Sequence, residues 1–385
     1  FVIAIIVIIF ATLYFHASPR FEKQIPAAEK GRMDLSAWDF NKNGVVELKG
    51  EWECYDGQLL LPEDFSGGVQ QKPRLTGYAK LTADGMESPG AYLPDPMGVR
   101  TFRLVVKTSP AVESLALNIN NVKMSSRVYI NGILQGAGGN PAEKEKGYQA
   151  KNAAYAAFFL NDKAEIEILL QTANYDVLFH QFLYALILGN QNDILSRNNI
   201  LFAVEFSGTI LFSIFGLFCI FLYSVNLKDK SLLAASLMYF FMAAIFPFGG
   251  IKYIYSLIPD MPYELFARLR ILILMGQRLS IVAYANAINK KVLPDAFARI
   301  IFIAGSIYCF AVLTAPLDLQ VYLKLDAAAP LFFALVYVYI LWKSWMFYRK
   351  TPPGSDLRVR VILHSVCLSF VLVTLINTFL YTSGL

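Results

Sequence analysis

Six long apolar segments in the second half of the chain constrain its fold more than any other feature. They lie at Ile200–Ser224, Leu232–Tyr255, Tyr263–Ile288, Phe297–Ala315, Val321–Phe347 and Leu357–Thr382. A bilayer core about 30 Å thick needs roughly 20 helical residues at about 1.5 Å of rise per residue, and these segments meet that length. Residues 199–385 therefore predict an α-helical transmembrane bundle.

Positive charge is unevenly distributed over the connections between these segments. Basic residues follow the first, third and fifth segments, namely Lys228, Lys230, Lys290, Lys291, Arg299, Arg349, Lys350, Arg358 and Arg360. The alternate connections hold Lys252 and Lys324. Because lysine and arginine favour the cytoplasmic side of a membrane, the first segment is expected to enter from outside. We therefore expect a multi-pass protein of the cell membrane, with residues 17–198 on the extracytoplasmic side.

The two ends of the sequence carry further expectations. Residues 1–16 form an apolar run that does not begin with Met, and we interpret them as a signal peptide or a signal-anchor helix. The same orientation returns Leu385 to the outside, which leaves the six-segment bundle without a cytoplasmic end. We therefore expect a seventh helix and a cytoplasmic module beyond this sequence.

Residues 17–198 have the pattern of an all-β domain. Only 16% of the whole chain is charged, and most of that charge falls in this part. Short stretches that alternate apolar and polar residues are typical of strands, and they lie at Thr101–Thr108, Ser114–Val122, Ser126–Gly136, Ala154–Leu160 and Ala164–Asn174. The pair Asn131-Gly132 is a strong signal for a two-residue hairpin. We predict a β-sandwich here, so the chain is a multi-domain membrane protein.

A possible metal loop opens this domain. Asp39, Asn41, Asn43 and Gly44 match the first ligand positions and the turn glycine of a calcium loop. The bidentate glutamate that such a loop needs is missing, because Gly50 occupies its position. We therefore favour a tight Asn-Gly turn over a calcium site, and we expect no metal and no cofactor. The three histidines are too far apart to form a recognisable ligand set.

Candidate ligand-binding residues combine aromatic rings with polar groups, as carbohydrate sites do. They fall in two loops rich in Gly, Pro and charge, Tyr92–Arg100 and Gly136–Asn152, and on one strand. The candidates are Trp52, Tyr92, Asp95, Arg100, Asn140 and Tyr148. The alternatives stay open: Trp38 and Trp52 as core aromatics, and both loops as solvated surface.

Ionisable residues inside the predicted membrane segments form a second set of candidates, since charge is costly in a bilayer. Four lie about 5–10 Å below the outer surface and two lie deeper, at about 1.5 Å per residue. They are Glu205, Arg268, Arg270 and Asp326, then Arg278 and His364. We hypothesise an outer latch of Glu205, Arg270 and Asp326, with Arg278 and His364 relaying its state inward. The alternative for the arginines is that they snorkel to the surface.

Several motifs in the order in which they occur resemble one bacterial family. They are "LKGEWECY", "GVRTFRLVV", "VYINGILQGAGGNP", "EIEILLQTANY" and "LYALILGNQNDI". They are similar to the seven-transmembrane receptors with diverse intracellular signalling modules, the 7TMR-DISM family. The resemblance implies an extracellular jelly-roll sandwich of the galactose-binding type, like those that bind carbohydrate. It also implies a homodimer and a missing output module, which is a histidine kinase, a diguanylate cyclase or a phosphatase.

A receptor for an extracellular small molecule or carbohydrate is therefore our leading functional hypothesis. A transporter or channel component with an external substrate-binding domain is the alternative, although we find no inverted repeat. A membrane enzyme acting on polysaccharide is a third, and no catalytic motif supports it. The scattered Lys and Arg do not indicate a nucleic-acid partner. The lipid bilayer is the partner that the composition itself implies.

Overall fold

The computed structural model describes most of the chain between residues 26 and 355. The described residues are 26–65, 73–82, 85–87, 97–109, 113–119, 122, 124–176, 183–225, 229–288, 293–314, 319–352 and 354–355. They divide into two compact units. The first contains residues up to Glu205 together with Gly249–Tyr263, and the second contains Phe206–Phe248 and the residues from Glu264 on.

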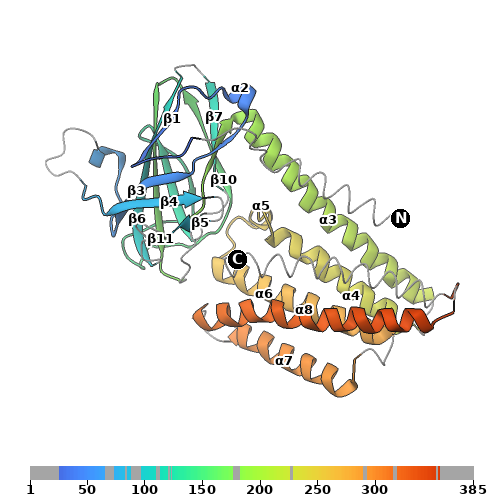
Figure 1. The fold of residues 1–385 in the computed structure, drawn as a ribbon. Helices are drawn as coiled ribbons and strands as arrows, with labels where there is room; N and C mark the ends of the chain where they lie inside the picture. The colour runs from blue at the N-terminus through green and yellow to red at the C-terminus, as the bar shows by residue number, and fades with distance from the viewer. Residues whose placement is uncertain are drawn as a thin grey trace. The chain divides into compact units, whose positions relative to one another are not determined.

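The first unit contains two β-sheets (Figure 1). In the larger sheet the order is β5-β4-β3-β6-β11-β8-β9, and β1 pairs with β6 in parallel. Its strands are β1 Arg32–Leu35, β3 Gly50–Asp56, β4 Gly77–Thr82, β5 Gly85–Glu87, β6 Gly98–Thr108, β8 Ser125–Ile130, β9 Ile133–Gly138 and β11 Glu165–Asn174. The smaller sheet has the order β10-β7-β12-β2, with β2 Val46–Glu47, β7 Glu113–Ile119, β10 Tyr155–Asn161 and β12 Ile187–Asn190.

The core lies between the inward faces of the two sheets. In β6 the side chains of Phe102, Leu104 and Val106 are fully buried, and their neighbours point the other way. The smaller sheet contributes Leu115 and Leu117 from β7 to the same cluster. This alternation is the period-two pattern that the sequence showed, so the predicted all-β domain is confirmed.

The predicted hairpin joins β8 to β9. Asn131 and Gly132 have φ values of 50° and 87°, which is the left-handed region that a two-residue type I′ turn requires. The Asn131 side-chain carbonyl also accepts a hydrogen bond from the Glu167 N–H at 2.9 Å, on the neighbouring strand β11. The turn therefore fixes the register of the hairpin and ties it to the sheet.

The segment that resembled a calcium loop is a short helix, α2 (Phe40–Asn43). Asp39 is its N-cap, and its carboxylate accepts hydrogen bonds from the N–H groups of Asn41 and Lys42 at 3.0 and 3.3 Å. The Lys42 ammonium lies 3.0 Å from the same carboxylate. These interactions, the Lys42 side chain first, hold the pKa of Asp39 below its ordinary value. The prediction of a tight Asn-Gly turn was wrong, because residues Phe40–Asn43 form one turn of helix that begins after the N-cap Asp39 and ends at Gly44.

Cys54 gives a direct test of the sandwich core. Burial raises the pKa of this thiol to about 12 from an ordinary value of 9.0. We expect no alkylation of Cys54 by iodoacetamide at pH 8 in the folded chain and rapid alkylation in guanidinium chloride, followed by mass spectrometry of its peptide. Because the folded-state pKa is raised, the stability linked to Cys54 is complete below about pH 9 and is lost as the pH rises towards 12. Equal labelling rates in both states would contradict the buried position.

The second unit is helical. From β12 on, the helical elements are α3 Gln191–Val225, α4 Lys230–Ile245, the 3₁₀ turn η2 Phe246–Phe248, α5 Ile254–Leu257, α6 Tyr263–Ile288, α7 Asp295–Thr314 and α8 Leu319–Lys350. Helices α3 and α6 begin in the first unit, and the short helix α5 lies entirely in it. Among the described residues, five helices are long and apolar enough to cross a membrane: α3, α4 extended to Phe248, α6, α7 and residues Ala329–Lys350 of α8. The sixth predicted segment lies outside the described residues.

The predicted boundary of the second membrane segment was wrong. Helix α4 ends at Ile245, and the residues up to Tyr255 form the turn η2, a loop and part of α5. Pro247 explains the early end, because proline has no N–H to donate and its ring disrupts the preceding turn. The helix therefore ends immediately before the proline-containing turn η2.

The far end of α8 has the composition of a membrane boundary. Trp342 and Trp345 are about half exposed, and the cations of Lys343 and Arg349 lie 5.3 and 5.0 Å from their ring centroids. Tryptophan and basic residues concentrate where the hydrocarbon meets the lipid head groups. This end of α8 therefore supports the assignment of a multi-pass membrane protein.

Candidate ligand-binding hollow

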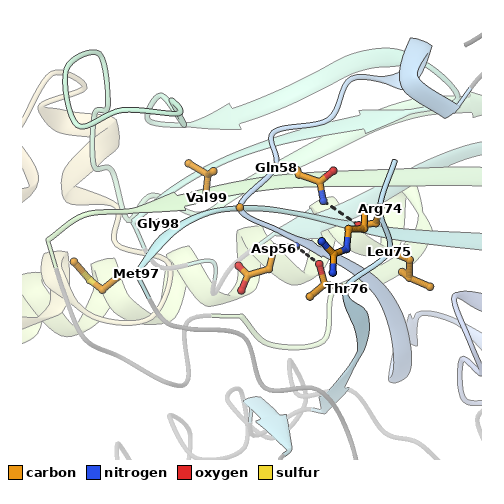
Figure 2. A pocket seen from close by; sticks show the side chains of 9 residues that line it. Asp56, Gln58, Arg74, Leu75, Thr76, Met97, Gly98 and Val99 are labelled. Atoms are coloured by element: carbon orange, nitrogen blue, oxygen red, sulfur yellow. Dashed lines mark hydrogen bonds between the residues drawn. The ribbon is translucent and has the colours of Figure 1, made fainter. Parts of the chain in front are cut away.

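The described part of the sandwich contains an open hollow of about 480 Å³ at one end of the larger sheet. Three strands meet there: β3 ends at Asp56, β4 begins at Gly77 and β6 begins at Gly98. Figure 2 shows the residues around it, which are Asp56, Gly57, Gln58, Arg74, Leu75, Thr76, Met97, Gly98 and Val99. The site is thus formed by strand ends and by the chain that leaves or enters them.

Two hydrogen bonds hold the rim of the hollow in place. The Asp56 N–H donates to Thr76 Oγ1 at 3.0 Å, and the Gln58 amide donates to the Arg74 carbonyl at 2.9 Å (Figure 2). The two bonds join the end of β3 and the residues after it to the segment before β4. The rim is therefore preorganised, which lowers the entropy that a bound ligand would cost.

The charges around the hollow are of two kinds. Arg100 is 1% exposed, and its Nε lies 3.3 Å from the Asp56 carboxylate, while another guanidinium nitrogen donates to the Met97 carbonyl. Arg74 is exposed at the rim. Asp56 therefore lines the hollow while it is paired with the buried Arg100 behind it, and Arg74 is an exposed cation of the lining.

The segment Gln58–Phe65, which we call the strap, covers the outer face of the larger sheet. The Leu60 N–H donates to Thr101 Oγ1 at 2.9 Å, and the Gln171 amide donates to the Leu60 carbonyl at 2.8 Å. Thr101 and Gln171 are outward-facing residues of β6 and β11, yet both are buried. Gln58, the first residue of the strap, lines the hollow, so one side of the hollow is attached to a segment that is hydrogen-bonded to the sheet.

An ion network lies beneath the end of the strap. Arg103 of β6 contacts Glu53 of β3 at 3.0 Å and Glu167 of β11 at 2.7 Å. The ring of Phe65 lies over its guanidinium, 4.8 Å from centroid to Cζ. Burial alone would lower the pKa of Arg103, but the hydrogen bonds to the two glutamates outweigh it and raise the pKa. One arginine thus joins three strands next to the site.

The predicted ligand residues Arg100, Trp52, Tyr92 and Asp95 differ in where the structure places them. Arg100 does not line the hollow; it is buried behind it and contacts the lining residues Asp56 and Met97. Trp52 was wrong as a ligand residue: it is fully buried and donates its indole N–H to the Leu48 carbonyl at 3.1 Å, so it is a core aromatic. Tyr92 and Asp95 lie outside the described residues.

Asn140 and Tyr148 are not among the residues that line the hollow. The Asn140 side chain accepts a hydrogen bond from Arg127 and donates to the Gly147 carbonyl at 2.6 Å. The Tyr148 ring packs edge-on against Tyr175 at 5.2 Å between centroids. Burial, and then the nearby Asp176, raise the pKa of Tyr148 above its ordinary value. The loop Gly136–Asn152 is therefore a folded element, held by its own side chains.

The candidates within the helices have different surroundings. Glu205 accepts a hydrogen bond from the Ile251 N–H at 3.3 Å. Arg268 pairs with Glu264 at 2.5 Å and donates to the Val312 carbonyl on α7. Arg270 is exposed on α6.

Arg278 is the deeply buried member of this set. It is 3% exposed on α6, its guanidinium lies 5.8 Å from the Phe333 ring, and its carbonyl accepts from the Tyr337 hydroxyl at 3.2 Å. The side chain of Asp326 and the whole of His364 lie outside what the structure describes. The proposed latch and relay therefore stay predictions.

Sequence reasoning missed Gln58, Arg74 and Thr76 as lining residues. They lie in connections without a motif, and their meeting depends on the pairing of β3 with β4 and β6. The one available signal was the loop Tyr92–Arg100, whose residues Met97, Gly98 and Val99 line the hollow.

No family model and no curated protein matches this chain. Its similar solved structures include a GH2 beta-galacturonidase from Eisenbergiella tayi, with 11% identity and a TM-score of 0.24 over 38% of this chain and 24% of that chain. A Faecalibacterium prausnitzii beta-glucuronidase has 13% identity and a TM-score of 0.24 over 34% and 21%. A putative beta-galactosidase from Bacteroides fragilis has 17% identity and a TM-score of 0.23 over 37% and 22%. The chain thus spans less than a quarter of each of these enzymes, and likeness at this level assigns it no activity.

Proposed function

We propose that this chain is the sensor part of a multi-pass membrane receptor. In this proposal the sandwich lies outside the cytoplasm and binds a small polar ligand, of which a carbohydrate is our first candidate, in the hollow. The helical bundle then relays the bound state to a cytoplasmic output module. The observation that carries the proposal is helix α3, which follows strand β12 directly and continues unbroken for 35 residues, from the sandwich into the bundle.

The first turns of helix α3, residues 191–198, pack against the outer face of the smaller sheet. Figure 1 shows α3 beginning beside this sheet. Gln191 accepts a hydrogen bond from Ser114 at 2.9 Å, and Asn198 pairs with Asn118 through two amide hydrogen bonds at 3.1 and 3.3 Å. Between them, Ile194 is fully buried in a cluster with Ala116. A helix held at three levels along one strand moves with that strand, so it can carry a displacement of the sandwich into the bundle.

The chemistry of the hollow supports a polyhydroxylated ligand. Asp56, Gln58, Arg74 and Thr76 supply a carboxylate, an amide, a guanidinium and a hydroxyl, and Met97 supplies apolar surface. Sugars need this combination of many hydrogen-bonding groups with an apolar patch. The motif resemblance to 7TMR-DISM receptors supports the relay, and it makes a histidine kinase our first candidate for the output module and a homodimer for the assembly.

Binding of defined glycans to the full chain in lipid nanodiscs tests the proposal. We expect Arg74→Ala to weaken the binding of a captured glycan by about tenfold, the loss of one hydrogen bond to a charged group. The matched control is Lys163→Ala, which removes one exposed cation beyond the opposite end of β6. Glycan binding that both variants leave intact would place the site elsewhere. No binding across glycans and other small polar ligands, or ligand-dependent transport into proteoliposomes, would overturn the receptor function.

A further inference from the structure

The segment Gly249–Tyr263 runs from the end of η2 to the first residue of α6. It belongs to the same compact unit as the sandwich, although it links two helices of the other unit. We call it the connector. Residues Phe206–Phe248 before it and the residues from Glu264 after it belong to the second unit, while the connector belongs to the first. A loop that merely joins two membrane helices needs no such attachment. Its contacts within the first unit therefore bear on how the sandwich reaches the bundle.

The base of α3 holds the start of the connector. The Glu205 carboxylate accepts a hydrogen bond from the Ile251 N–H at 3.3 Å. A Cβ on Gly250 would lie 1.9 Å from Glu205 Oε1, so the carboxylate and the backbone approach this closely only because residue 250 is glycine. One turn earlier on α3, the Phe202 ring packs edge-on against Tyr253 at 5.5 Å.

The sandwich holds the middle of the connector. The Lys151 ammonium lies over the ring of Tyr255 at 5.7 Å, a cation–π geometry. The Lys151 N–H donates to the Met124 carbonyl at 2.7 Å, which fixes this residue beside the start of strand β8. Burial raises the pKa of Tyr255, and a hydrogen bond from the Asn152 backbone opposes that rise. The contact thus involves a side chain and the backbone of the loop Gly136–Asn152.

The connector is packed rather than solvated. Tyr253, Tyr255 and Met261 are 3, 7 and 5% exposed. The Lys252 N–H donates to the Gly249 carbonyl at 2.6 Å, which closes a turn in which Lys252 has a φ of 54°. A compact segment whose side chains are buried in this way transmits a displacement, whereas a solvated loop would absorb it.

The connector joins the two helices at defined points. At its start, Phe246-Pro247-Phe248 is a single 3₁₀ turn after the end of α4, and at its end Tyr263 is the first residue of α6. Because proline interrupts helical hydrogen bonding, the end of α4 bends more readily than a continuous helix. A displaced connector would therefore shift the end of α4 and the beginning of α6 together.

We propose that the connector is a coupling element that passes the state of the sandwich to α4 and α6, in parallel with the direct path through α3. The Lys151–Tyr255 contact is its input from the sandwich, and Glu205 is its link to α3. This inference rests on the proposed receptor function, since it names the element through which the receptor would be regulated. It predicts that loosening the sandwich contact loosens both flanking helix ends.

Hydrogen–deuterium exchange of the full chain in nanodiscs tests this without a ligand. We expect Lys151→Ala and Tyr255→Ala to speed exchange of peptides within 249–263 by about tenfold, and of the adjoining residues 239–248 and 264–270 by at least about threefold. Lys146→Ala is the matched control, because Lys146 is an exposed lysine of the same loop. Tyr255→Phe keeps the aromatic ring and should keep the protection. Unchanged exchange across residues 101–108 of β6 verifies that each variant is folded.

Two results would overturn the proposal. Unchanged exchange of the connector in Lys151→Ala and Tyr255→Ala would show that the sandwich does not hold it. Faster exchange of the connector with unchanged exchange of both flanking helix ends would show that it does not transmit. Neither result depends on glycan binding, so a failed glycan experiment with a positive exchange result would refute the proposed ligand and leave the coupling in place.

Discussion

Replacing Trp52 by Ala is expected to lower the free energy of unfolding of the sandwich by about 3–5 kcal/mol. Trp52 is fully buried in the core cluster, and its indole N–H donates to the Leu48 carbonyl at 3.1 Å. The substitution opens a cavity on β3 and leaves a buried carbonyl without its donor. Thermal or urea unfolding of the full chain, followed by β-sheet circular dichroism, measures the loss.

The control variant is Trp52→Phe, which keeps an aromatic ring and removes the indole N–H. It should cost clearly less than the alanine variant, since more of the volume stays filled. If Trp52→Ala costs below about 1 kcal/mol, as for an exposed site, the assignment of Trp52 to the core is wrong. Trp52 would then again be a candidate ligand-binding residue.

Replacing Gly50 by Ala is expected to cost several kcal/mol, about 3 or more, because two independent penalties add at this position. Its φ of 108° is strained for any residue with a Cβ. A Cβ there would also lie 2.3 Å from the carbonyl oxygen and 2.4 Å from the nitrogen of Ala28. These are backbone atoms held by hydrogen bonds to Lys49 and Glu51 at 2.7 Å each, so they cannot simply move aside.

Gly44→Ala is the matched control for this prediction. Gly44 also has a positive φ, 71°, but a Cβ there meets nothing within 4 Å. It should therefore cost only the backbone strain of this conformation, with φ 71° and ψ −151°, about 1–3 kcal/mol. The difference between the two variants measures the contact of the Ala28 segment with β3. Equal unfolding free energies would contradict that contact.

The period of the apolar residues predicted much of this fold. The strand at Thr101–Thr108 and the hairpin at Asn131-Gly132 were recognisable because alternation and turn chemistry are local properties of the chain. Helix α6 begins at Tyr263 and ends at Ile288, as the length of its apolar run indicated. The end of α4 was misplaced because hydropathy continues through Pro247 while helical hydrogen bonding does not.

The candidate site was less predictable than the fold. Arg74 and Thr76 belong to no recognisable motif. They come to line the hollow only because β3 pairs with both β4 and β6. The Arg103 network joins residues that are 50 and 64 positions apart in the sequence. Trp52 was misassigned for the same reason, since an aromatic residue on a strand can face either the core or a ligand. Which face it occupies is set by strand register across the whole sheet.

The seat of α3 on β7 restricts what kind of motion the helix can make. Ser114, Ala116 and Asn118 are spaced by the two-residue period of a strand, whereas Gln191, Ile194 and Asn198 are spaced by helical turns. Turning the helix by one residue, about 100°, would swing Ile194 out of its apolar seat and part the paired amides. Rotation of α3 about its own axis relative to the sandwich is therefore opposed by the contacts of its first turns. The motions that keep these contacts are a tilt or an axial shift in which the sheet and the helix move together.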